Sequence, residues 1–109
     1  MNINFDDIEI MSPDDGGGSV FYYNNLPFTG TILEYSNGVL VGEITVVDGS
    51  TNGRVALYYN NGSIKEEYFQ SYNRPFGIYK SWDENGNLFE EQDFGDEYPS
   101  LARASRSRK

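Results

Sequence analysis

The dipeptide Asn-Gly recurs at a fixed spacing of 24 residues, at Asn37-Gly38, Asn61-Gly62 and Asn85-Gly86. It favours a tight hairpin turn of type I′, because both central residues of that turn need a positive φ. When the three segments around these dipeptides are aligned, four further positions, here called columns, repeat. They hold a leading glycine (Gly30, Gly53, Gly77), an aromatic residue (Tyr35, Tyr58, Trp82), an aliphatic residue (Leu40, Ile64, Leu88) and a glutamate (Glu43, Glu67, Glu91). The chain is therefore an internal repeat whose unit is one β-hairpin.

The repeat predicts an all-β fold, in which repeated antiparallel β-hairpins form a single elongated, twisted sheet. The hairpin region covers residues 20–96, and its three units span 27–49, 50–72 and 73–96. Turn-forming residues at Asp48–Ser50 and Asn73–Pro75 join the units. Because each hairpin contacts only its neighbours, we expect an aromatic ladder in the Tyr35 column and an aliphatic ladder in the Leu40 column. The leading glycines are expected to let a neighbouring ring or backbone approach closely.

Both ends of the chain depart from the repeat. Residues 1–19 are predicted to hold a capping strand within Ile3–Ile10, followed by a flexible loop at Pro13–Ser19. The segment Ser19–Gly30 indicates a strand that enters the first unit. Residues 97–109 end in the small, polar and basic stretch "LARASRSRK", for which we expect disorder or, alternatively, a remnant of an expression vector.

The charge of the chain limits its partners. It has 8 basic and 17 acidic side chains, a net charge of −9. Four of the basic residues lie in the last nine positions, so residues 1–100 hold 4 basic and 17 acidic side chains, a net charge of −13. Such a surface repels nucleic acid and anionic lipid and attracts basic partners. We therefore expect neither direct nucleic-acid binding nor membrane binding.

The chain contains no cysteine and no histidine. Their absence removes the usual nucleophile and the commonest general base, so we assign no catalytic residue and do not expect an enzyme. The adjacent carboxylates Glu66 and Glu67 do not form a catalytic pair, because neighbours in a strand point to opposite faces. A chain without disulfides or a signal-like N-terminus is expected in the cytoplasm.

Two segments bear a partial likeness to ligand-binding loops. Asp83–Asn87 resembles part of a calcium loop, but it lacks the required acidic spacing, and a hairpin turn already explains its Asn-Gly. The glycine-rich stretch Asp14–Ser19 has no lysine and no following helix, and its two aspartates would repel phosphate. We therefore expect no metal and no cofactor.

The repeated columns resemble the MORN-repeat family, and more closely its bacterial variant. In that variant an aromatic residue, polar residues, Asn-Gly, an aliphatic residue and a glutamate follow one another in this order. The stretch "PFTG" at Pro27–Gly30 is similar to its entry motif. The resemblance covers roughly residues 20–96. It departs from the eukaryotic consensus in its longer, acidic second strand and in Ile78 and Trp82 of the last unit.

The bacterial variant is similar to a family of antitoxin or immunity proteins encoded beside polymorphic toxins, which are often nucleases or nucleic-acid deaminases. The resemblance therefore implies an immunity protein that binds a cognate protein toxin, basic and acting on nucleic acid, and occludes its active-site cleft. The alternative is a MORN-type scaffold or adaptor without a toxin partner. Because an exposed last strand can pair between copies, we expect a monomer or a weak dimer.

The acidic and aromatic residues of the later units form the candidate partner-binding surface. The acidic strip is either solvated strand surface or a phosphate-mimicking strip that fits a basic cleft, and the sequence leaves both interpretations open. Rings outside the repeated aromatic column are candidate anchors, because buried aromatic side chains supply much of the binding energy at interfaces. The predicted contact residues are Glu66, Glu67, Glu90, Glu91, Asp93, Tyr59, Tyr68 and Tyr72.

Overall fold

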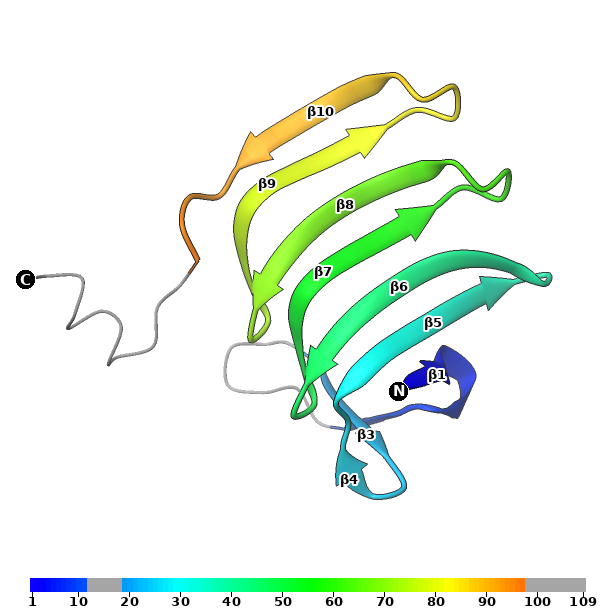
Figure 1. Ribbon diagram of the computed structural model, residues 1–109, viewed down its shortest axis with the longest axis vertical. Coiled ribbons are helices and arrows are strands. Elements are labelled where there is room, and N and C mark those ends of the chain that lie inside the picture. Colours follow the sequence, from blue (N-terminus) through cyan, green and yellow to red (C-terminus); the bar gives the residue numbers. More distant parts are fainter. Residues whose placement is uncertain (12–18, 98–109) are drawn as a thin grey trace, which may run out of the picture.

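The computed structural model describes residues 1–11 and 19–97 and confirms the predicted all-β class. A large, open sheet holds seven strands in the order β1-β5-β6-β7-β8-β9-β10 (Figure 1). Its repeat strands follow one another along the chain as antiparallel neighbours. Their bounds are β5 Gly30–Ser36, β6 Val39–Val47, β7 Ser50–Tyr58, β8 Ile64–Ser71, β9 Arg74–Trp82 and β10 Leu88–Asp93.

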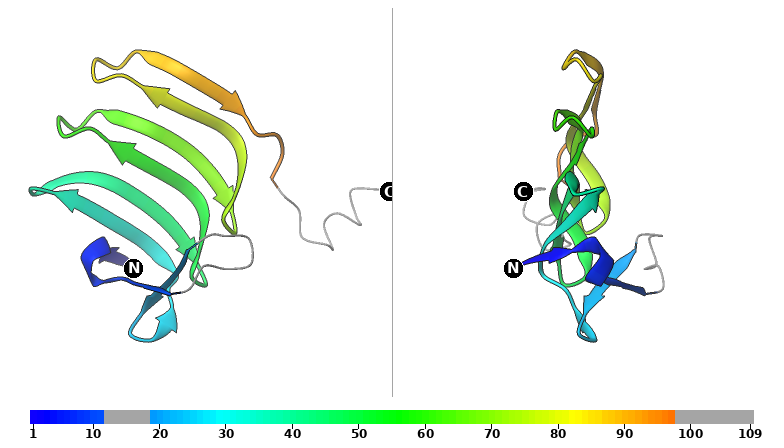
Figure 2. Two further views of the ribbon diagram at one scale, coloured as in Figure 1. Left: turned by 180° about the vertical axis from the view of Figure 1, so that it is seen from behind. Right: turned by 90° about the vertical axis from the view of Figure 1, so that its right-hand side faces the viewer.

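A second, smaller sheet lies beside the first hairpin, and the sequence analysis did not predict it. It holds β2 (Glu9–Met11), β3 (Val20–Tyr23) and β4 (Leu26–Pro27) in that order, all antiparallel. The single strand expected to enter the first unit is thus a short hairpin of its own. Figure 2 shows the large sheet edge-on, with the N-terminal elements near one end of it.

The N-terminal capping strand is divided in two. Strand β1 (Asn2–Asn4) pairs in parallel with β5, a 3₁₀ turn follows at Phe5–Asp7, and the chain then enters β2. The single strand predicted within Ile3–Ile10 is therefore wrong in its extent, although β1 does cover the β5 edge. The predicted loop at Pro13–Ser19 and the C-terminal tail lie largely outside the described residues.

The three Asn-Gly dipeptides form two kinds of turn. Asn37 and Gly38 have φ values of 52° and 81°, which gives the predicted type I′ turn between Ser36 and Val39. In the other two hairpins only the glycines, Gly62 and Gly86, have positive φ. The prediction of type I′ is wrong there, because each loop has one more residue.

Both longer loops are closed by the same pair of hydrogen bonds. The Gly62 amide donates to the Tyr59 carbonyl (2.9 Å), and the Tyr59 amide donates to the Ser63 carbonyl (2.9 Å). The Gly86 amide donates to the Asp83 carbonyl (3.0 Å), and the Asp83 amide donates to the Asn87 carbonyl (2.9 Å). This is a three-residue loop whose last residue is a left-handed glycine.

The turns between hairpins are also tight. Asp48 and Gly49 both have positive φ and connect β6 to β7, as predicted. Tyr72 and Asn73 do the same between β8 and β9, so that turn begins one residue earlier than expected. Of the leading glycines, Gly30 shows the expected close approach, since a Cβ there would collide with the Met1 carbonyl oxygen, whereas a Cβ at Gly77 would meet open space and the expectation is wrong there.

Strand register divides the side chains of the large sheet between two faces, because paired residues share a face and neighbours alternate. The core face carries Ile32 and its partner Ile44. The opposite face carries Leu33 and its partner Glu43. Irregular pairing between β6 and β7, and again between β8 and β9, accompanies the bend of the strands in Figure 1 without changing this alternation.

The hydrophobic core lies on the core face at the N-terminal end of the sheet. Its buried cluster is Phe21, Phe28, Ile32 and Val46. Backbone hydrogen bonds hold the small sheet there: the Phe21 amide donates to the Gly49 carbonyl (2.8 Å), and the Gly49 amide donates to the Phe28 carbonyl (2.8 Å). The later strands extend beyond this core, and every residue of β10 is exposed.

The position of the core predicts unequal costs for removing two phenylalanine rings. Phe28 is 4% exposed, and Phe28→Ala should lower the free energy of unfolding by about 3–5 kcal/mol, because it leaves a cavity. Phe89 is 67% exposed, and Phe89→Ala should change it by no more than about 0.5 kcal/mol. Urea denaturation measures both, and equal losses would contradict this location of the core.

Candidate functional site

The repeated rings do not stack on one another. Within each hairpin the aromatic residue pairs with the aliphatic residue of the same unit: Tyr35 with Leu40, Tyr58 with Ile64 and Trp82 with Leu88. All six lie on the opposite face, but rings of successive units are two strand spacings apart, roughly 10 Å. Each ring therefore lies beside an aliphatic neighbour, and the aromatic column shares one face of the sheet without direct contact between successive rings.

The predicted contact residues do not form one surface. Register places Glu66, Tyr68 and Glu90 on the core face, and Glu67 and Glu91 on the opposite face. Asp93 also lies on the opposite face, where its carboxylate accepts a hydrogen bond from the Gly95 amide (2.7 Å).

The two remaining predicted anchors lie at the ends of hairpins. The Tyr59 hydroxyl donates to the Trp82 carbonyl (2.7 Å), and the Lys65 ammonium lies 5.6 Å from the centre of the Tyr59 ring. Tyr59 therefore joins two hairpins. Tyr72 belongs to the β8–β9 turn and is 55% exposed.

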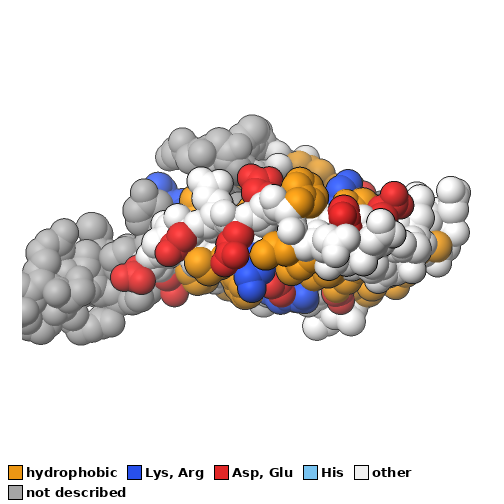
Figure 3. Space-filling model, turned by 90° about the horizontal axis from the view of Figure 1, so that it is seen from above, with side chains coloured by type: hydrophobic (Ala, Val, Ile, Leu, Met, Phe, Trp, Pro, Cys, Tyr) orange, Lys and Arg blue, Asp and Glu red, His pale blue; other side chains and the backbone are white. Residues whose placement is uncertain are grey.

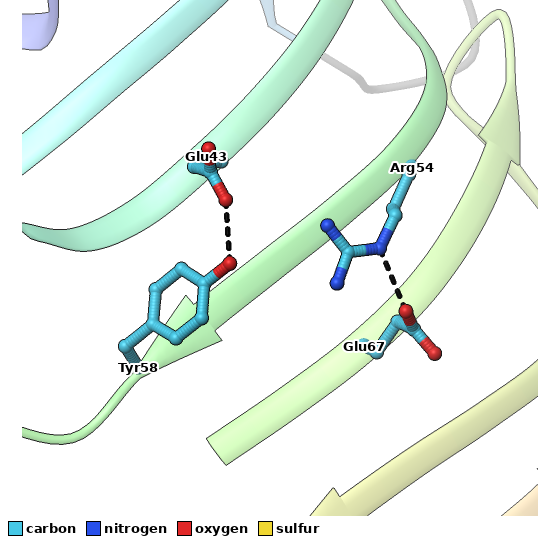
Figure 4. Close-up of polar contacts among 4 residues, drawn as sticks. All are labelled: Glu43, Arg54, Tyr58 and Glu67. Atoms are coloured by element: carbon cyan, nitrogen blue, oxygen red, sulfur yellow. Dashed lines mark hydrogen bonds and ion pairs between the residues drawn. The ribbon is translucent and has the colours of Figure 1, made fainter. Parts of the chain in front are cut away.

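The carboxylates of the opposite face are engaged by the sheet itself. Strand β7 supplies a donor to each of its neighbours: the Tyr58 hydroxyl donates to Glu43 (2.5 Å), and Arg54 Nε donates to Glu67 (2.6 Å) (Figure 4). The bond to Glu67 raises the pKa of Arg54, and the bond to Glu43 raises the pKa of Tyr58. Lys80 is in register with both Glu67 and Glu91. Side chains of neighbouring strands thus offset much of the negative charge of the glutamate column on this face.

The core face is different where it extends beyond the core. An open hollow of about 350 Å³ lies there, between β8, β9 and the segment that follows β10. The rings of Tyr68 and Tyr79 line it with centroids 6.0 Å apart. Its lining residues are Glu66, Tyr68, Gln70, Pro75, Tyr79 and Phe94. We call this the tyrosine hollow.

Glu66 in the lining of the tyrosine hollow and Glu90 in the same row form no ion pair with any residue in the described part of the chain. Ser81 is in register with both Glu66 and Glu90, so the three form a row across β8, β9 and β10. The Tyr79 hydroxyl donates to Glu66 (3.1 Å). Burial raises the pKa of Tyr79, the bond to Glu66 raises it further, and the charge of Glu90 adds to the same effect. Both carboxylates therefore act on this phenol.

Ser81 is the most deeply buried member of that row. It is 3% exposed, and its hydroxyl has no hydrogen-bond partner among the described residues. Four of the residues that line the hollow are not among the contact residues predicted from the sequence: Gln70, Pro75, Tyr79 and Phe94. The two-residue alternation along β9 places Tyr79 with Ser81, but that signal has meaning only once the register against Glu66 is known.

The described residues contain no cluster of three acidic side chains placed to hold a metal ion. In the same residues, no helix has the length and hydrophobicity to cross a bilayer. Comparison of the chain with models of protein families, with curated proteins and with solved structures finds no match. The resemblance to the MORN-repeat family therefore stays a prediction.

The geometry of the hollow predicts how Tyr79 titrates. Glu66→Gln should lower the pKa of Tyr79 toward its ordinary value, because the carboxylate that raises it is gone while burial remains. Glu67→Gln, one residue away on the opposite face, should leave that titration unchanged. NMR of ¹³C-labelled tyrosine, assigned with Tyr79→Phe, measures the shift. An equal response to both substitutions would contradict the division of the two glutamates between faces.

The stability that Tyr79 contributes has a defined pH window. A raised pKa in the folded state means that the contribution is complete below the pKa of the unfolded phenol, near 10, and is lost as the pH rises through the folded value. Tyr79→Phe should therefore reduce the fall in unfolding free energy above pH 10. Denaturation at a series of alkaline pH values measures it. The same steep fall in the variant would show that other groups cause the alkaline loss.

Proposed function

We propose that this protein is an immunity protein that binds a basic protein toxin and inhibits it stoichiometrically, without turnover. One observation carries the proposal: beyond the core, the core face presents a tyrosine-lined hollow that includes Glu66, with Glu90 in the same row of residues, and neither carboxylate forms an ion pair with a described residue. Aromatic walls supply contact area, and unpaired carboxylates supply attraction for a basic surface.

The class of partner follows from charge and from the resemblance together. A body with a net charge of −13 over residues 1–100 attracts a basic protein and steers its approach. Proteins that act on nucleic acid carry basic substrate clefts, which a row of carboxylates can occupy in place of phosphates. The resemblance to the bacterial MORN variant adds the expectation that this basic partner is a nuclease or a nucleic-acid deaminase encoded beside the gene.

Co-expression tests the proposal directly. Cells that express the protein encoded by the neighbouring gene should stop growing, and this chain should restore their growth and co-purify with that protein. Growth arrest that this chain does not relieve would reject the immunity function. Recovery of a stable complex with a non-toxic partner would instead support a scaffold or adaptor.

A pair of double variants locates the contact. Glu66→Gln with Glu90→Gln removes two charges from the core face, and should slow association by roughly threefold to tenfold at low salt and weaken its salt dependence. Glu43→Gln with Glu67→Gln removes two charges from the same strand system on the opposite face, and should leave the association rate nearly unchanged. Stopped-flow association at several salt concentrations measures both rates. A larger effect of the control would place the interface on the opposite face.

A further inference from the structure

The two ends of the large sheet differ in whether the chain covers the outermost strand of the repeat. At one edge β1 pairs with β5, and Met1 lies against Gly30 so closely that a Cβ there would meet the Met1 carbonyl. At the other edge, β10 is the last strand in the order, and no described strand pairs with its outer side. All six of its residues are exposed, so a row of backbone donors and acceptors faces outward.

The side chains of β10 define what this edge can accept. The strand carries Glu90 on the core face and Glu91 and Asp93 on the opposite face, with no basic residue of its own. Its exposed hydrophobic residues include Phe89, which is 67% exposed, and Leu88, which is 48% exposed. Figure 3, which looks onto this side of the molecule, shows acidic side chains interspersed with hydrophobic ones, with basic side chains beside some of them.

Inside the sheet, a neighbouring strand supplies hydrogen-bond donors to the glutamates of the repeated column. On the opposite face, β7 supplies Tyr58 to Glu43 on β6 and Arg54 to Glu67 on β8. Glu91 occupies the equivalent column on β10, with Lys80 in register on its inner side and no described strand on its outer side. A further strand paired with the outer side of β10 could place a donor side chain opposite Glu91, as β7 does for Glu43 and Glu67.

We propose that the outer edge of β10 is a docking site for an extended, basic segment of a partner protein, which adds to the sheet as an antiparallel strand with a lysine or arginine opposite Glu91. Backbone hydrogen bonds give such a strand its affinity, and the alternate side chains give it specificity. This inference rests on the proposed function for the identity of the partner, and adds to it that the partner binds through an extended, strand-forming segment.

A second copy of the chain fits this edge poorly. Because paired residues share a face, the two antiparallel registers nearest full overlap of two β10 strands place either Glu90 opposite Glu90 of the other copy or Glu91 opposite Glu91. Like charges that lie directly opposite in a sheet are destabilising. The same carboxylates attract a strand that carries lysine or arginine. Charge therefore favours a basic partner over self-association.

A synthetic peptide tests the edge without any toxin. The probe is a six-residue peptide, matched to the length of β10, in which lysine alternates with valine. Titrated into the ¹⁵N-labelled full chain, it should shift the amide resonances of β10 and slow their hydrogen exchange, while those of β5 and β6 stay unchanged. The same peptide N-methylated at every residue keeps its charges but has no backbone donors, and it should not bind.

Two charge reversals provide the matched comparison. Glu91→Lys should weaken peptide binding by about tenfold, because an attractive cross-strand pair becomes a repulsive one. Glu91→Gln, which disturbs the strand less, should give an intermediate loss. Glu84→Lys makes the same change of charge in the exposed β9–β10 loop and should keep the Kd within about twofold.

Each contrary result overturns the inference in a different way. Equal binding of the N-methylated peptide would mean that charge alone attracts the probe. A full chain that is dimeric, with β10 amides protected before any peptide is added, would make a second copy the occupant. Much tighter peptide binding after neutralisation of Arg103, Arg106, Arg108 and Lys109 would make the chain's own tail the occupant. Absence of peptide binding together with successful toxin neutralisation would reject the edge site and leave the proposed function standing.

Discussion

Antiparallel pairing through tight turns is the constraint on which the rest of this structure depends. The turns at Asn37-Gly38, Asp48-Gly49 and Tyr72-Asn73 hold two consecutive residues at positive φ. Each such turn fixes the register in which the strand after it pairs with the strand before it. Because side chains alternate along a strand, register also decides the face of every residue. The separation of Glu66 from Glu67, and of Glu90 from Glu91, follows from the backbone before any side-chain contact is considered.

The repeat made the hairpins predictable from sequence, and one overlooked spacing explains the error in the turns. In the first unit one residue lies between Tyr35 and Asn37, whereas in the later units two residues lie between Tyr58 and Asn61 and between Trp82 and Asn85. The extra residue lengthens the loop, so that only the glycine adopts a left-handed conformation. The same dipeptide thus serves two loops, and the residue count between columns distinguishes them.

Other features depend on contacts that local patterns do not encode. The small sheet forms because Phe21 and Phe28 bury their rings against Ile32 and Val46, a meeting of segments that no repeat column indicates. The tyrosine hollow likewise requires Tyr79 to lie beside Tyr68 across two strands. The acidic and aromatic residues of the surface, and the opposite orientation of Glu66 and Glu67, were predictable from the sequence, whereas the face that holds the core and the carboxylates that the sheet already engages were not.

The hydrophobic core and the proposed binding surfaces lie at opposite ends of the large sheet. The core lies under the first hairpin and the small sheet, whereas β10 is exposed along its whole length and pairs with β9 alone among the described strands. Elements with little buried surface open most easily, so the last hairpin draws least support from the core. A partner that pairs with the β10 edge or covers the tyrosine hollow would bury surface that the chain leaves open. Part of the binding free energy would then stabilise the last hairpin, and affinity would depend on how well ordered that hairpin is before the partner arrives.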